Sequence, residues 1–217
     1  MGRIIDLTMR LGEGMPVYPG DPKFTREIRR AKESLGRTSY QTWTLGNHNG
    51  THIDYPAHFF EEGANSNFYE DVDDFEMQGT LFNLRGMGSV INQQAVEKIK
   101  DVNGALLLYT GFIELAGLNG YKDNDFPYLT PLAAQTILDN NPKLRRLGID
   151  SFSVDSRDSL GVHKLILYNK VPIIEGLTNL SQLYDSIDKR KDSFTFHCVP
   201  LKVDRADAVL VRAYAEI

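Results

Sequence analysis

Cysteine and long apolar runs are scarce in this chain, and each scarcity excludes a class of protein. Cys198 is the only cysteine among the 217 residues, so no disulfide forms within the chain and a cysteine-based zinc site is excluded. No apolar run approaches the ~20 residues that cross a bilayer. The residues near the N-terminus also lack the long apolar stretch of a signal peptide. We therefore expect a cytoplasmic protein with no membrane partner.

Basic clusters are scarce as well. The chain has 24 Lys and Arg against 29 Asp and Glu, so its formal net charge is -5. Proteins that bind nucleic acid usually carry a basic patch or stripe, and no long Lys/Arg-rich run occurs here. We predict a small-molecule substrate and no nucleic acid.

No linker, internal repeat or low-complexity segment divides the chain. We therefore expect a single domain over residues 1–217, of the α/β class because strand patterns outnumber helix patterns. The apolar run 105–109 is typical of a buried strand, and Thr130 before Pro131 is typical of a helix start. Helices are predicted over residues 92–100, 130–138 and 160–168, and strands over residues 4–8, 40–45, 80–84, 105–109, 146–149, 171–174, 194–203 and 208–213.

Three of the five histidines fall within eleven residues. His48, His52 and His58 lie close to Asp54 in the segment His-Asn-Gly-Thr-His-Ile-Asp-Tyr-Pro-Ala-His. Imidazoles and carboxylates bind zinc, manganese and iron well. In a strand His48, His52 and Asp54 would share one face, and in a helix His48 and His52 would lie one turn apart. Either geometry brings two imidazoles to one ion, so the segment predicts a metal site.

Other polar residues are ambiguous from the sequence. His163 lies on a predicted helix among apolar residues and, taken alone, is more typical of a core histidine. Glu175 ends an apolar strand and precedes a glycine, where a functional carboxylate and a rim glutamate are about equally common. Asp150 and Asp155 are typical either of residues that orient ligands or of turns and caps. We interpret His197 as structural, because no carboxylate lies near it in sequence.

The segment at residues 48–58 resembles the signature of the cyclase-like metal hydrolase family, which includes bacterial kynurenine formamidases and isatin hydrolases. The resemblance extends over nearly the whole chain. Further stretches that resemble the family are Pro16–Asp21 (its N-terminal substrate loop), Gly148–Asp155 (its central strand and turn), His163 with Ile173–Leu177 (its second metal-ligand region), and Pro200–Lys202 with Val211–Ala213 (its closing strands).

The resemblance implies a compact α/β domain with a mixed β-sheet core and flanking helices, of the swivelling β/β/α type. It implies a homo-oligomer, as a dimer or a dimer of dimers. It also implies two divalent ions per chain, with zinc favoured and manganese the alternative. His48, His52 and Asp54 would hold one ion, His163 would hold the second, Asp54 and Glu175 would reach both, and His58 would be the general acid/base.

The function that this resemblance implies is hydrolysis of a non-peptide amide by metal-activated water. The expected substrate is an aryl formamide such as N-formylkynurenine, or a small cyclic amide. A lactone hydrolase or a cyclase with the same metal site stays open as an alternative. So does a non-catalytic metal-binding or ligand-binding protein, although such a protein has no need of an acid/base such as His58 beside a full set of ligands.

Two tyrosines depart from the family pattern. Tyr18 stands where kynurenine formamidases have a tryptophan that contacts substrate, so we expect Tyr18 to bind substrate. Tyr55 stands where the family usually has a small residue between Asp and Pro. A change in the pocket lining and simple packing explain Tyr55 equally well at this point.

Overall fold

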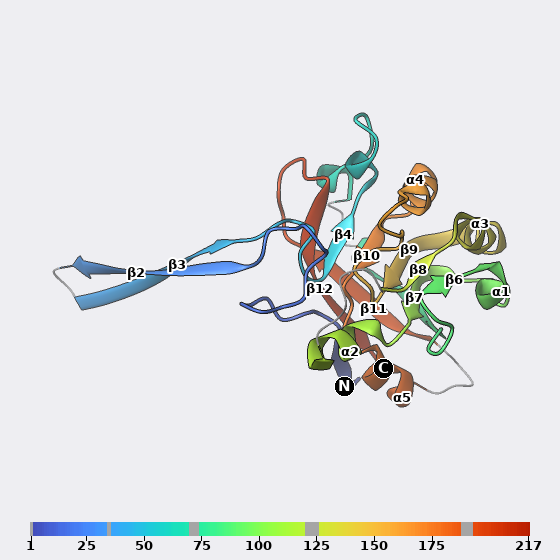
Figure 1. The fold of residues 1–217 in the computed structure, drawn as a ribbon, viewed down its shortest axis with the longest axis horizontal. Helices are drawn as coiled ribbons and strands as arrows, with labels where there is room; N and C mark the ends of the chain where they lie inside the picture. Colours follow the sequence, from blue (N-terminus) through green and yellow to red (C-terminus); the bar gives the residue numbers. More distant parts are fainter. Residues whose placement is uncertain (1, 34–35, 70–73, 120–125, 188–192) are drawn as a thin grey trace.

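A mixed β-sheet forms the centre of the molecule (Figure 1). The computed structural model describes residues 2–33, 36–69, 74–119, 126–187 and 193–217. The strands are β1 (Ile4–Asp6), β2 (Thr25–Glu33), β3 (Gly36–Thr44), β4 (His52–Asp54), β5 (Glu76–Asn83), β6 (Val90–Ile91), β7 (Asn103–Tyr109), β8 (Tyr128–Leu129), β9 (Lys143–Ile149), β10 (Ile173–Glu175), β11 (Ser193–Pro200) and β12 (Ala208–Glu216). The helices are α1 (Gln93–Val96), α2 (Phe112–Asn119), α3 (Pro131–Asn140), α4 (Gly161–Tyr168) and α5 (Leu180–Ser186), with 3-10 turns η1 (Pro56–His58) and η2 (Ser66–Tyr69).

The main sheet closes on itself. Its strand order is β1-β12-β11-β5-β7-β9-β10-β4, and β4 pairs with β12 as well as with β10. The run β5-β7-β9-β10 is parallel, whereas β4, β11, β12 and β1 pair antiparallel. The short strand β4 therefore lies between β10 and β12, where segments distant in sequence meet.

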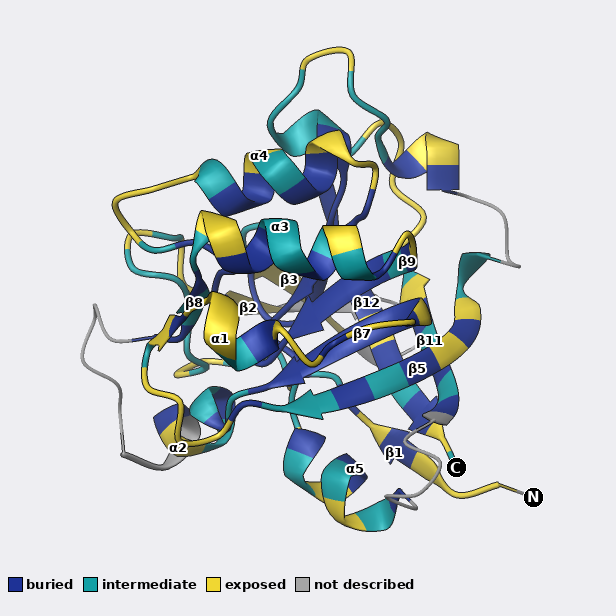
Figure 2. Ribbon diagram, turned by 90° about the vertical axis from the view of Figure 1, so that its right-hand side faces the viewer, coloured by how far each residue is buried: buried dark blue, intermediate teal, exposed yellow. Residues whose placement is uncertain are grey.

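Helices cover one face of the parallel strands (Figure 2). On β7, Leu106 and Leu108 pack with residues of α1, α3 and α4, while Ala105 and Leu107 pack on the opposite face with residues of α5 and β12. Successive strand residues point to opposite faces, so a strand covered on both faces is apolar throughout. This explains the continuous apolar run of β7 and confirms the α/β class with a mixed sheet and flanking helices.

The helix boundaries differ in part from the prediction. Thr130 caps α3 as expected, since its hydroxyl oxygen accepts a hydrogen bond from the backbone N–H of Ala133 at 3.2 Å. The helix predicted over residues 92–100 is wrong in length, because α1 ends at Val96. The chain then turns back toward β7, with Ile99 buried and Asp101 at a φ of 61°.

Strands β2 and β3 form an arm that projects from the rest of the molecule (Figure 1). Of the strand predicted over residues 40–45, residues 40–44 belong to β3, which begins earlier, at Gly36, and ends at Thr44. Its partner β2 was not predicted. Within the described ranges, no helix combines the length and hydropathy that a membrane span requires.

Candidate metal centre

The pairing of β4 with β10 places three predicted ligands together. His52 is opposite Glu175 in the antiparallel register, and Asp54 lies two residues after His52. Because side chains alternate along a strand, His52 and Asp54 share the face that Glu175 occupies on β10. Ile53 and Ile174 point the other way and pack in the core. His52 Nε2 lies 3.4 Å from Asp54 Oδ1 and 3.6 Å from Glu175 Oε2.

Helix α4 brings His163 to the same point. Its Nε2 atom lies 3.2 Å from Glu175 Oε1 and 3.4 Å from Asp54 Oδ2. Asp155 sets this orientation, since it accepts hydrogen bonds of 2.8 Å from the backbone N–H groups of Val162 and His163 and lies 2.8 Å from His163 Nδ1. Of the two roles open for Asp155, the structure therefore shows both a helix cap and contact with a predicted ligand. Asp150 lies elsewhere and accepts hydrogen bonds at the start of α2.

The turn before β4 places His48. His48 Nδ1 lies 3.0 Å from Asp54 Oδ1. The turn packs tightly on the loop after β10, because a Cβ atom on Gly176 would lie 2.3 Å from the carbonyl oxygen of Gly50, and both glycines have a φ of +67°. Thr51 ties the two loops together, since its hydroxyl donates to the Gly176 carbonyl at 2.7 Å.

His58 lies at the rim of this cluster, on η1. Its imidazole is half-buried, and its ring centroid lies 4.3 Å from that of His48. The Nδ1 atom of His58 contacts Asp207 Oδ2 at 3.1 Å, and the same oxygen lies 3.2 Å from His48 Nε2. Sequence reasoning missed Asp207, which is 149 residues from His58 and belongs to no motif near it.

The buried polar atoms at the centre fit a divalent cation. Four ligand atoms are buried: His52 Nε2, His163 Nε2 and both carboxylate oxygens of Asp54. None of these atoms has a hydrogen-bond partner among the described residues. Buried polar groups are normally paired, so four unpaired ligand atoms that converge indicate a metal site. In the described part of the chain, the ligand atoms of His48, Asp54 and His58 lie within 4.8 Å of one another. The same holds for the ligand atoms of His52, Asp54 and Glu175.

The electrostatics also favour a cation. Burial would raise the pKa of Asp54, but the charge of His52 and the close imidazoles of His163 and His48 hold it well below its usual value. Burial would lower the pKa of His163, but Glu175, Asp155 and Asp54 raise it well above the usual value. The pKa of His48 likewise rises to about 9, because Asp54 and Asp207 outweigh its burial. The buried carboxylates thus hold positive charge at this point, which protons or a divalent cation can supply.

A cavity of about 220 Å³ opens onto the cluster. Tyr18 lines it and contacts Phe126 edge-on at a centroid distance of 5.7 Å. Asp21 also lines it, and burial raises the pKa of that carboxyl. The remaining lining residues are His48, Asp54, His58, Phe59, Phe152, Ser153, Leu160, His163 and Glu175.

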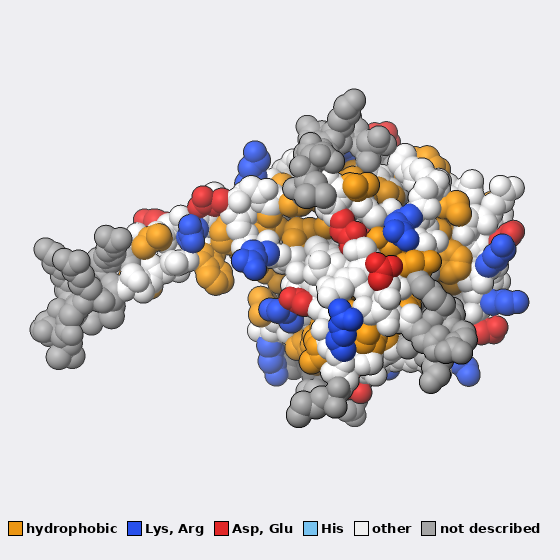
Figure 3. Space-filling view, turned by 90° about the horizontal axis from the view of Figure 1, so that it is seen from below, with side chains coloured by type: hydrophobic (Ala, Val, Ile, Leu, Met, Phe, Trp, Pro, Cys, Tyr) orange, Lys and Arg blue, Asp and Glu red, His pale blue; other side chains and the backbone are white. Residues whose placement is uncertain are grey.

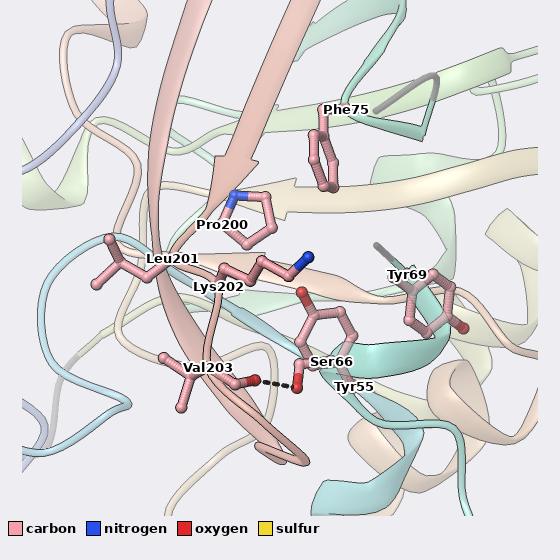
Figure 4. A pocket seen from close by; sticks show the side chains of 8 residues that line it. All are labelled: Tyr55, Ser66, Tyr69, Phe75, Pro200, Leu201, Lys202 and Val203. Atoms are coloured by element: carbon pink, nitrogen blue, oxygen red, sulfur yellow. Dashed lines mark hydrogen bonds between the residues drawn. The ribbon is translucent and has the colours of Figure 1, made fainter. Parts of the chain in front are cut away.

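Tyr55 points away from this cavity. It lines a separate hollow of about 170 Å³ together with Tyr69, Phe75 and the Pro200–Val203 segment (Figure 4). Its ring stacks on Tyr69 at a centroid distance of 5.1 Å, and its side chain is buried. The packing explanation is therefore the one the structure supports for Tyr55.

A comparison with known families agrees with this geometry. The model of the Cyclase family matches residues 5–156, which include the segment from His48 to His58. The chain belongs to the Cyclase family.

Relatives with curated names extend the match over nearly the whole chain. The kynurenine formamidase of Geobacillus thermodenitrificans is 31% identical over 221 residues, covering 96% of this chain and 95% of the relative. That of Erythrobacter litoralis is 26% identical and covers 97% and 92%.

Solved structures show the same Cyclase-family fold. Isatin hydrolase A from Ralstonia solanacearum superposes with a TM-score of 0.78 at 18% identity, covering 99% of this chain and 92% of that chain. Isatin hydrolase A from Labrenzia aggregata superposes with a TM-score of 0.77 at 18% identity, covering 99% and 93%. At these identities the superpositions describe the fold.

Proposed function

We propose that this Cyclase-family chain is a metal-dependent hydrolase of non-peptide amides, with an aryl formamide such as N-formylkynurenine or a small cyclic amide as substrate. The observation that carries the proposal is the set of unpaired, buried ligand atoms on His52, Asp54 and His163 beneath a cavity. The cavity has aromatic side chains, Tyr18 and Phe152 among them, that suit a flat aryl group. The names of the curated relatives point to the same chemistry.

We assign the metal ligands as the five residues that converge on this point. Asp54 faces His48 and His52 with one carboxylate oxygen and His163 with the other. Glu175 faces His52 and His163 in the same way. This arrangement supports two ions per chain, with zinc favoured and manganese the alternative, because imidazole with carboxylate suits both metals. A bound divalent ion would polarise the amide carbonyl and lower the pKa of water.

His58 is assigned as the general acid/base. It lines the cavity at the rim of the cluster. Burial lowers its pKa, the neighbouring His48 and His163 lower it further, and Asp54 and Asp207 oppose the shift. The neutral imidazole can therefore accept a proton from the attacking water and return it to the leaving nitrogen. The aromatic rings of Tyr18, Phe59 and Phe152 would hold the aryl group and exclude water from it.

Assay of the zinc-loaded protein against aryl formamides, isatin-like cyclic amides, lactones and a linear peptide tests this function. We expect turnover of at least one amide class and none of the peptide. Turnover of lactones alone, or of a cyclisation substrate alone, would favour the lactonase or cyclase alternative, which the same metal site allows. Tight binding of the amides without turnover would indicate a ligand-binding protein and contradict the proposal.

We also propose that the chain forms one domain over residues 1–217 and that it acts as a homo-oligomer. Pairing of β1 with β12 joins the two ends of the chain in one sheet and supports the single domain. The projecting arm supports the oligomer (Figure 3), because an isolated two-stranded hairpin is only marginally stable in water. On one face of the arm Ile28 and Trp43 are 54% and 60% exposed, so we expect a second copy of the chain to cover them.

Substitution on the arm should separate the copies. Ile28→Lys places a charge on the proposed contact and is expected to shift the mass measured by light scattering from a dimer or a dimer of dimers to the monomer. Leu132→Lys is the matched control, because Leu132 is 57% exposed on α3, far along the chain from the arm. A monomeric wild-type protein, or an unchanged mass in the arm variant, would contradict the proposal.

A further inference from the structure

Asp207 has an unusual position in this site, because one of its carboxylate oxygens contacts two of the site's imidazoles. Its Oδ2 atom lies 3.1 Å from His58 Nδ1 and 3.2 Å from His48 Nε2. Its Oδ1 atom accepts a hydrogen bond of 2.8 Å from the side-chain amide of Asn47. Asp207 is not among the described residues that line the cavity, and its side chain is 43% exposed, so it contacts the imidazoles from outside the cavity.

The backbone holds Asp207 in place. It directly precedes β12, in which Ala208 is the register partner of Asp54. The backbone carbonyl of Asp207 accepts a hydrogen bond of 2.9 Å from the N–H of Tyr55. Asn47 donates to the Ala208 carbonyl at 3.2 Å as well as to the carboxylate. The same strand pairing that builds the metal centre therefore fixes the position of this carboxylate.

The contacts determine which ring nitrogens carry hydrogen. At neutral pH Asp207 carries a carboxylate, because aspartates in water have a pKa of about 3.9, and its Oδ1 atom already accepts the hydrogen bond from Asn47. A carboxylate only accepts hydrogen bonds, so His58 Nδ1 and His48 Nε2 must both donate. In neutral His58 this leaves Nε2 as the bare nitrogen. In neutral His48 the bare nitrogen is Nδ1, which lies 3.0 Å from Asp54 Oδ1. Two atoms that both carry lone pairs lie this close only when a cation or a proton is between them.

We propose that Asp207 is a positioning residue that selects the Nδ1–H tautomer of His58 and the Nε2–H tautomer of His48. This inference rests on the proposed function, in which His58 moves the proton and His48 binds metal. One carboxylate thereby couples the acid/base to the metal ligand. A group that orients a ligating or catalytic imidazole in this way typically contributes 10–100-fold to metal affinity or activity.

The variant Asp207→Ala tests the proposal, and Asp204→Ala is its control. Asp204 lies in the same loop, is exposed, and contacts only Asn67 and Arg205 in the hydrogen bonds that the structure shows for its side chain. We expect Asp207→Ala to lower the affinity for Zn²⁺ alone and kcat each by roughly 10–100-fold, with KM unchanged because the side chain does not line the cavity. Asp204→Ala should change none of these.

Ring ¹⁵N chemical shifts of the zinc-loaded protein report the tautomers directly. We expect the Nδ1–H form of His58 in the wild type and loss of this preference in Asp207→Ala. If that variant does not fold, Asp207→Asn removes the charge at the same position and is judged by the same measurements. A His58 that keeps its tautomer, or a kcat no lower than that of Asp204→Ala, overturns the proposal. Unchanged zinc affinity overturns it for His48.

Failure of the proposed function is distinguishable from failure of this inference. If the zinc-loaded wild type turns over none of the amides or lactones, the hydrolase assignment fails. The ring shifts and the zinc affinity still decide whether Asp207 orients the two imidazoles, because neither measurement needs a substrate.

Discussion

Removal of the divalent ion with a strong chelator is expected to abolish amide hydrolysis, and added Zn²⁺ or Mn²⁺ is expected to restore it. The physical reason is that the buried ligand atoms of His52, Asp54 and His163 have no hydrogen-bond partner among the described residues. Without a metal ion, water at neutral pH is a weak nucleophile with a pKa of about 15.7, whereas metal-bound water can have a pKa near 7. Hydrolysis rates and metal content, measured together across a titration with the chelator, check this prediction.

Loss of one ligand should reproduce the effect of the chelator. His52→Ala removes a buried imidazole and is expected to weaken metal binding by more than roughly 100-fold, because loss even of a group that only orients a ligand costs 10–100-fold. His197→Ala is the matched control, since His197 is mostly buried, stacks on Tyr214 and lies outside the cavity. It should keep both metal and activity. Full activity in a demonstrably metal-free preparation would exclude a metal-dependent reaction.

His58→Ala is expected to lower kcat by roughly 10²–10⁴-fold while the metal content stays close to that of the wild type, because general acid–base catalysis contributes a factor of this size. The side chain of His58 is 28% exposed at the rim of the cluster, whereas that of His52 is 3% exposed at its centre. The two histidines should therefore differ in their effects. Metal stoichiometry, thermal midpoint and kcat, measured on both variants, separate them.

The pH profile gives a second measurement on His58. Burial lowers its pKa from the ordinary value of 6.5, so the neutral base persists to a lower pH. The acidic limb of kcat/KM should therefore fall below pH 6.5 in the wild type and should lose this dependence in His58→Ala. His58 also lies within ligand distance of His48 and Asp54. If His58→Ala empties the site of metal, His58 is a ligand instead, and if it only lowers the thermal midpoint, His58 is a packing residue.

The sequence alone predicted a metal site, because three of the proposed ligands lie on one short segment. His48, His52 and Asp54 are separated by so few residues that a strand or a turn alone brings them together. Capping and apolar runs likewise predicted α3 and β7, since these depend on neighbouring residues. The short helix α2 carries apolar residues on most of its sides and was missed, because its burial depends on Phe126 and Phe152 from other segments.

The remaining parts of the site depend on contacts between distant segments. His163 has an ordinary core pattern, and only the packing of α4 beside β10 turns its Nε2 atom toward Asp54 and Glu175. Asp207 reaches His58 because β12 pairs with β4, across 149 residues of sequence. The side-chain direction of Tyr55 also follows from this pairing, since the backbone N–H of Tyr55 donates a hydrogen bond to the carbonyl of Asp207, the residue before β12. Side-chain chemistry and short spacing are local properties of a chain, whereas the register between strands is set by burial of the whole core.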